Sequence, residues 1–221
     1  MRYTHCFFDL DGTLIDSSPG ITHSVQYALR KSGIEPPPAD TLTCFIGPPL
    51  LDSFRKYFHM SLTDATRAVA FYRENYRAGG MLECRVYDGI RHLLDRLTEN
   101  AVVPVLATCK PTCFAEQILA HFGLRDLFAF VSGPELDGTR GEKHEVIAYA
   151  MEKLGLSDTD SILMIGDRDN DVLGAAAHRI ACAGALWGFG SRDELERAGA
   201  AFLFASPLDL EKQIFDSDDT K

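Results

Sequence analysis

The sequence has no excess of positive charge and no long hydrophobic run, and both absences narrow its range of functions. Its 22 lysines and arginines are outnumbered by 32 aspartates and glutamates, giving a formal net charge of −10. This balance offers no basic field to a nucleic acid polymer or an anionic membrane. No apolar run approaches the ~20 residues of a spanning helix, and the N-terminus lacks a signal-peptide pattern. We therefore expect a cytoplasmic protein whose partners include no nucleic acid polymer and no membrane.

The chain also lacks any C-x-x-C pair. Its six cysteines are scattered and fall mostly in apolar segments, which predicts reduced thiols rather than a zinc site or a disulfide framework. What the sequence does have is enough apolar material for a core, since 46% of its 221 residues are hydrophobic. A chain of this length forms one large domain, or one domain with an insert.

Three short apolar runs each end abruptly in a polar loop. They cover residues 6–8, 102–107 and 162–165. The runs lead into Asp9, Thr108 and Asp167, and similar runs occur near 180–183 and 201–204. Apolar strands that alternate with helices predict a doubly wound α/β fold, with a parallel sheet covered on both faces. Ligands bind such sheets at the carboxyl ends of the strands, so the three polar loops are expected to meet at one site.

The strand pattern disappears between residues 17 and 85. Apolar residues such as Ile21 and Val25 recur there at helical spacing, which predicts a helical insert. Turn-forming residues flank the insert, at 17–20 on entry and at 87–89 on exit.

These boundaries predict two domains. Residues 1–16 and 86–221 are expected to form the α/β core domain, and residues 17–85 a helical cap domain inserted into it. The acidic residues 216–219 near the C-terminus are expected to fray.

Aspartates concentrate at two of the predicted strand ends. Asp9 and Asp11 are separated by one residue, and a turn that Gly12 permits would bring both into one site. Asp167 and Asp171 are spaced to face the same way over one helical turn. Four carboxylates in one crevice repel one another unless a cation is present. Hard oxygen ligands select magnesium over zinc or copper, so the sequence predicts a Mg²⁺ site, which in proteins is often shared with phosphate oxygens.

Two further residues suit a phosphate group. Thr108 offers a hydroxyl, and the amides after it, at a helix start, favour an anion. Lys143 begins the helical stretch that leads to Leu154 and offers a compensating positive charge. Lys110 is an alternative source of that charge.

In chain order, these residues resemble the four motifs of the haloacid dehalogenase superfamily of phosphohydrolases. The motifs are Phe8-Asp9-Leu10-Asp11-Gly12-Thr13-Leu14, Thr108, Lys143 and Gly166-Asp167-Arg168-Asp169-Asn170-Asp171. The resemblance spans nearly the whole chain, and it implies a Mg²⁺-dependent phosphoric monoester hydrolase.

The resemblance also implies a mechanism. Asp9 would attack phosphorus to form an aspartyl phosphate, and Asp11 would protonate the leaving oxygen and later deprotonate the hydrolytic water. The metal residues would be Asp9, Asp11 through its backbone carbonyl, and Asp167. Asp171 would lie near the water shell of the metal.

By the same resemblance, Thr108, Cys109 and Lys143 form the phosphate-binding set. Cys109 stands where the family frequently has Asn, and His144 stands where a Pro frequently follows the lysine. Neither departure removes a charge that the mechanism needs.

Two segments also resemble one particular branch of the family. Segments 45–50 and 187–190 resemble the phosphoglycolate phosphatases and bacterial 5'-nucleotidase-like enzymes. The implied substrate is a small phosphomonoester, phosphoglycolate-like first and nucleoside 5'-monophosphate second. Arg55 and Lys56 are candidate substrate contacts in the cap, although a solvated helix face is the favoured interpretation of both.

Two other functions stay open at this point. A phosphomutase would return the phosphoryl group to a sugar instead of to water, and a non-catalytic phosphate-binding protein could share the same fold. A monomer and a homodimer are both compatible with the sequence.

Overall fold

The computed structural model describes residues 3–216, which fall into two compact units. The larger unit contains the chain up to Ile15 and again from Val86 onward, and the smaller unit is Asp16–Arg85. Residues 217–219 of the expected acidic tail lie outside the described residues. No helix within residues 3–216 is long and apolar enough to cross a membrane.

A six-stranded sheet with parallel pairing throughout forms the centre of the larger unit. Its strands are β1 (His5–Phe8), β4 (Val103–Ala107), β5 (Phe130–Ser132), β6 (Ile162–Gly166), β7 (Ala181–Ala185) and β8 (Phe202–Phe204). They lie in the order β5-β4-β1-β6-β7-β8. This arrangement confirms the predicted doubly wound α/β fold.

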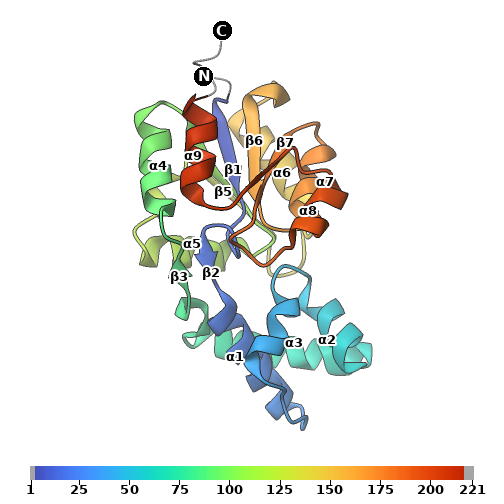
Figure 1. The fold of residues 1–221 in the computed structure, drawn as a ribbon. Helices are drawn as coiled ribbons and strands as arrows, with labels where there is room; N and C mark the ends of the chain where they lie inside the picture. The colour runs from blue at the N-terminus through green and yellow to red at the C-terminus, as the bar shows by residue number, and fades with distance from the viewer. Residues whose placement is uncertain (1–2, 217–221) are drawn as a thin grey trace. The chain divides into compact units, whose positions relative to one another are not determined.

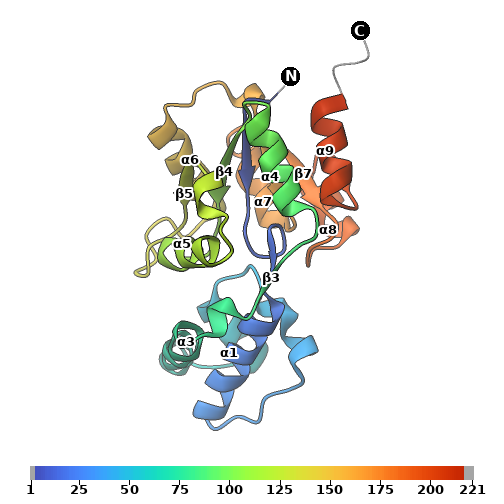
Figure 2. The same cartoon turned by 90° about the vertical axis from the view of Figure 1, so that its left-hand side faces the viewer.

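Helices cover both faces of this sheet (Figure 1). They are α4 (Ile90–Glu99), α5 (Thr112–His121), α6 (Lys143–Leu154), α7 (Asp169–Ala176), α8 (Arg192–Ala198) and α9 (Pro207–Asp216). Helices α4 and α9 lie on one face, and α6, α7 and α8 lie on the other; α4 is in front of the sheet in Figure 2. Single 3₁₀ turns precede β5 at Arg125–Leu127 and β6 at Thr159–Ser161.

The central strands are apolar on both faces because both faces are covered. Phe7 in β1 and Met164 in β6 are fully buried and belong to one core with Val146 of α6 and Val172 of α7. Burial on both sides explains why these strands read as uninterrupted apolar runs in the sequence.

The strand order places the functional loops next to one another. The chain builds β1, β4 and β5 outward in one direction, and then returns to the other side of β1 for β6, β7 and β8. Phe8 is in register with Leu106 on one side and Ile165 on the other. The residues that follow β1, β4 and β6 therefore emerge side by side, at the reversal of strand order where such sheets bind ligands.

The smaller unit is helical. It contains α1 (Ser18–Lys31), α2 (Leu50–Phe58) and α3 (Leu62–Arg77), with 3₁₀ helices at Ala39–Phe45 and Gly80–Leu82. Ser61 caps α3, because its hydroxyl accepts a hydrogen bond from the Asp64 amide. Helix α1 packs along α3, and Phe45 contacts Phe54 edge to face. The short strands β2 (Ile15–Asp16) and β3 (Arg85–Val86) form a separate two-stranded sheet.

Candidate active site

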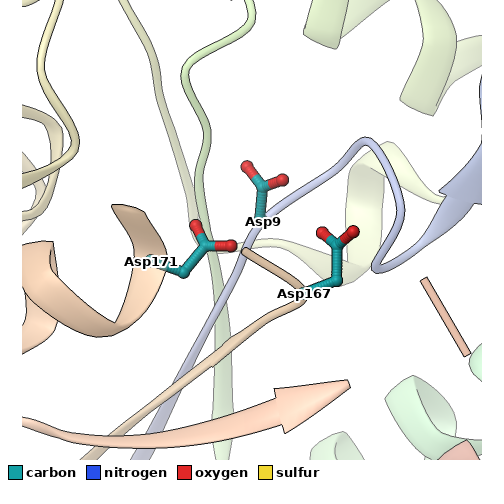
Figure 3. Close-up of side chains that lie close together, drawn as sticks. All are labelled: Asp9, Asp167 and Asp171. Carbon is teal, nitrogen blue, oxygen red and sulfur yellow. The ribbon is translucent and has the colours of Figure 1, made fainter. Parts of the chain in front are cut away.

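Three buried aspartates converge at the carboxyl end of the sheet. Asp9 directly follows β1, Asp167 directly follows β6, and Asp171 lies in the first turn of α7. One carboxylate oxygen from each lies within 4.8 Å of the others. Figure 3 shows the three side chains close together, with Asp9 on the segment after β1 and with Asp167 and Asp171 on the segment that runs from β6 into α7. Such a set of hard oxygen donors suits a divalent cation such as Mg²⁺.

The loop after β7 holds Asp167 in place. The Phe189 amide donates to Oδ2 of Asp167 at 2.8 Å, and the Thr13 hydroxyl donates to Oδ1 at 3.3 Å. A Cβ at Gly190 would lie 1.7 Å from the Asp167 carbonyl oxygen, so only glycine permits this approach. The Trp187 indole donates to the Thr13 carbonyl at 2.9 Å and ties the loop to the segment after β1. This support was not predicted from the sequence, where segment 187–190 served only as a resemblance to the branch.

Lys143 links two of the three carboxylates. Its Nζ lies 2.7 Å from Oδ1 of Asp9 and 2.7 Å from Oδ1 of Asp171, and it donates to the Ala107 carbonyl at 2.9 Å. The lysine is 4% exposed. A Cβ at Gly174 would lie 2.5 Å from its Cγ, so the glycine makes room for the aliphatic stem.

The electrostatics of this cluster favour a further cation. Burial raises the pKa of Asp9 to about 6, with Lys143 acting in the opposite direction and Asp171 in the same one. Burial also raises the pKa of Asp167 well above its usual range, and Asp171 and Asp9 add to the effect. Burial by itself would lower the pKa of Lys143, but Asp171 and Asp9 raise it well above its ordinary value. A divalent cation would relieve the repulsion that one lysine leaves, so the residues fit Mg²⁺.

Asp11 does not join the three carboxylates. Both of its carboxylate oxygens accept hydrogen bonds from Lys110 Nζ, at 2.6 and 2.7 Å. Gly12 makes the intervening turn with a φ of +86°, and a Cβ there would lie 2.1 Å from Asp167 Oδ2. Of the four carboxylates expected in one crevice, three thus come together and the fourth pairs with a lysine of its own. Lys110 is no substitute for Lys143, since Lys143 contacts Asp9.

The other expected phosphate-binding residues follow β4. Thr108 is 1% exposed, and its hydroxyl accepts a hydrogen bond from the Lys110 amide at 3.2 Å. Burial raises the pKa of the Cys109 thiol to about 12, so this side chain stays neutral. Asn170 donates from Nδ2 to Cys109 Sγ at 3.8 Å. The Cys109 side chain therefore contributes no negative charge to this loop.

Arg55 and Lys56 lie elsewhere in the chain. Both are exposed on α2 of the smaller unit, and the Lys56 ammonium lies 5.0 Å from the centre of the Tyr57 ring. They belong to the smaller unit, whereas the aspartate-lysine cluster belongs to the larger one.

The doubly wound fold is the one that the four motifs predict, and comparison with known proteins gives the family. A model of the family described as haloacid dehalogenase-like hydrolase matches residues 6–185. A 5'-nucleotidase of Pseudomonas aeruginosa is 43% identical over 98% of this chain and 97% of its own length. A phosphoglycolate phosphatase of Haemophilus influenzae is 30% identical over 82% of this chain and 85% of its own.

Tyrosine-protein kinase PtkA of Mycobacterium tuberculosis is 39% identical over 86% of this chain, which spans 64% of that kinase. The crystal structure of a predicted phosphatase from Clostridium acetobutylicum superposes with a TM-score of 0.93 at 44% identity, covering 98% of this chain and all of that one. The chain therefore belongs to the haloacid dehalogenase-like hydrolases. The family and the enzyme class that the sequence predicted, a phosphatase, are confirmed.

Proposed function

We propose that this phosphatase hydrolyses small phosphomonoesters with Mg²⁺, through a phosphoryl group carried on Asp9. The observation that supports it most is the cluster of Asp9, Asp167 and Asp171 around one space, with Lys143 paired to Asp9. A nucleophile, a cation site and a fixed positive charge thus occur together at the carboxyl end of the sheet.

The chemistry proceeds in two steps. Asp9 attacks phosphorus; the bond from its carboxylate oxygen to phosphorus forms while the bond to the leaving oxygen breaks, and Asp11 gives that oxygen a proton. Water then attacks the same phosphorus and loses a proton to Asp11, which releases inorganic phosphate and restores Asp9. Lys143 donates to Oδ1 of Asp9 and leaves Oδ2 for the attack.

Mg²⁺ would be held by the carboxylates of Asp9 and Asp167 and the backbone carbonyl of Asp11, with Asp171 beside its water shell. When bound, the cation neutralises charge that develops on the phosphoryl oxygens. Asp171 also shares Lys143 with Asp9, and this restricts the position of the ammonium group.

Phosphoryl oxygens would be bound by the Thr108 hydroxyl, the Cys109 amide and the Lys143 ammonium group. The loop that carries the first two leads into α5, which begins at Thr112, so the N-terminal end of that helix adds a favourable dipole. These donors are fixed before substrate arrives, because Thr108 and Lys143 are buried and hydrogen-bonded.

Nucleoside 5'-monophosphates are the first substrate class in this proposal, and phosphoglycolate is the second. The sequence motifs suggested the reverse order. The 5'-nucleotidase relative, at 43% identity over nearly its whole length, supports the new order over the phosphoglycolate phosphatase at 30%. We propose residues 17–85 as the cap that selects among these small substrates, with Arg55 and Lys56 as contacts to the part of the substrate away from phosphorus.

A substrate panel tests the proposal. It contains nucleoside 5'-monophosphates, phosphoglycolate, sugar phosphates and phosphotyrosine, each with Mg²⁺ and with chelator, and phosphate release is measured. We expect release that requires Mg²⁺, fastest with a nucleotide, and loss of about 1,000-fold or more in Asp9→Asn because the nucleophile is removed. Full turnover by Asp9→Asn would exclude the aspartyl phosphate. Conversion of a hexose 1-phosphate without phosphate release would identify a mutase instead.

A further inference from the structure

The larger unit contains a second buried lysine for which the proposed chemistry assigns no role. The side chain of Lys110 is 5% exposed and that of its partner Asp11 is 12% exposed. The ammonium group contacts both carboxylate oxygens, at 2.6 and 2.7 Å. A buried lysine is costly unless it is paired in good geometry, as this one is.

The backbone around Lys110 sets the direction of this side chain. Its amide donates to the Thr108 hydroxyl at 3.2 Å, directly after β4. Its carbonyl packs against the loop after β5, where a Cβ at Gly133 would lie 2.5 Å from the carbonyl oxygen. Lys110 is therefore held between two loops that follow neighbouring strands, and it presents its ammonium group from a fixed place.

The two buried lysines divide the carboxylates between them. Lys143 pairs with Asp9 and Asp171, which belong to the nucleophile and metal side, whereas Lys110 pairs with Asp11. Four carboxylates with two ammonium groups retain two negative charges, which one divalent cation balances. If Asp11 had no lysine of its own, its carboxylate would be drawn toward that cation, because opposite charges attract strongly in a buried site.

We propose that Lys110 is a positioning residue for the leaving-group half of the reaction. It holds the Asp11 carboxyl group apart from the metal carboxylates. When one Asp11 oxygen carries the proton that it gives to the leaving oxygen, the other oxygen keeps its hydrogen bond from Lys110. The inference rests on the proposed function of Asp11. A positioning role for Lys110 differs from phosphate binding in one measurable way. It affects only those substrates whose leaving oxygen needs a proton.

Leaving-group dependence tests this role. Lys110→Met keeps the length of the side chain and removes its charge. With a nucleoside 5'-monophosphate, whose leaving alkoxide needs a proton, we expect kcat to fall about 100-fold, within the range for general acid catalysis, with KM little changed. With p-nitrophenyl phosphate, whose leaving group departs without a proton, the fall should be under about 10-fold. Lys110→Arg, which can pair with both Asp11 oxygens, should recover part of the loss.

Three controls accompany this measurement. Lys212→Met removes an exposed lysine of α9 and should leave both substrates unaffected. Asp11→Asn should show the same substrate split as Lys110→Met, and the double variant should lose little more than either, because both act through one group. Thermal unfolding of each variant with Mg²⁺ checks the fold, and Lys110→Gln provides a second uncharged variant if Lys110→Met unfolds.

Equal losses on the two substrates would overturn the inference, and so would a rise in KM with unchanged kcat, which would make Lys110 a phosphate-binding residue. If either of these results were found while Asp9→Asn is inactive, only the role of Lys110 would be excluded and the proposed function would be unaffected. Full activity of Asp9→Asn would instead overturn the proposed function itself.

Discussion

The two aspartates that follow β1 and β6 lie where a proton and the proposed Mg²⁺ would compete for them. Burial raises the pKa of Asp9 from 3.8 to about 6 and raises that of Asp167 well above the same starting value. A carboxyl group whose pKa is higher in the folded state stabilises the fold when it is protonated. That contribution is complete below the ordinary pKa and is lost as the pH rises through the folded value, about 6 for Asp9. Metal-free protein should therefore lose stability over this interval.

Mg²⁺ should reverse this trend, because it binds the deprotonated carboxylates. We expect the rise in melting temperature on replacing chelator by Mg²⁺ to be small near about pH 5 and larger near about pH 7.5, above the folded pKa of Asp9. Differential scanning fluorimetry at the two pH values measures it. A rise of equal size at both pH values would place the metal away from Asp9 and Asp167.

A second prediction at the level of single residues concerns Gly190 and the Mg²⁺ requirement. Gly190→Ala would push a methyl group onto the Asp167 carbonyl and shift the loop, so the Phe189 amide would lose its hydrogen bond to Asp167 Oδ2. Losing such a bond to a metal ligand typically weakens metal binding by 10- to 100-fold, so the Mg²⁺ concentration for half-maximal activity should rise by about that factor. Phe189→Ala keeps the amide and is the matched control. An unchanged Mg²⁺ requirement in Gly190→Ala would show that the loop does not support the ligand.

At the scale of elements, the apolar runs predicted β1, β4 and β6 because these strands are buried on both faces. Strand β5 was not predicted, since Phe130–Ser132 is too short to give a periodic signal. The convergence of the loops after β1, β4 and β6 was predictable because parallel strands share one carboxyl edge. The existence of this shared carboxyl edge was predictable from the sequence. Which side chains pair with one another at the edge was not.

The pairing of Asp11 with Lys110 shows where prediction stopped. It depends on the turn at Gly12 and on how the loop after β4 packs against Gly133, and both are tertiary features. From the sequence we therefore expected all four carboxylates to lie together, with Lys110 as a possible replacement for Lys143. The structure separates the two lysines because they start from different elements, the loop after β4 and the first turn of α6.

At the scale of the whole molecule, the charge of −10 opposes the approach of an anionic substrate. Lys143 and the proposed Mg²⁺ act only at short range, because salt screens charges over about 10 Å at 0.1 M ionic strength. A substrate with a second anionic group, such as phosphoglycolate, would then need further cations to bind that group. In the smaller unit, Arg55 and Lys56 are exposed and adjacent on α2, which suits them to this task.

Substitution of these two cations tests the cap proposal. The double variant Arg55→Met with Lys56→Met should raise KM for phosphoglycolate by about 10-fold or more, since a hydrogen bond to a charged group contributes about 1.5–3 kcal/mol. Its kcat should stay near that of the parent, as should both constants for p-nitrophenyl phosphate, which lacks a second anionic group. Lys31→Met is the matched control, because Lys31 lies 5.4 Å from the centre of the Tyr27 ring in the same unit, much as Lys56 lies by Tyr57. An unchanged KM for phosphoglycolate in the double variant would assign Arg55 and Lys56 to an ordinary solvated helix face, and substrate selection would then depend on other residues of the cap.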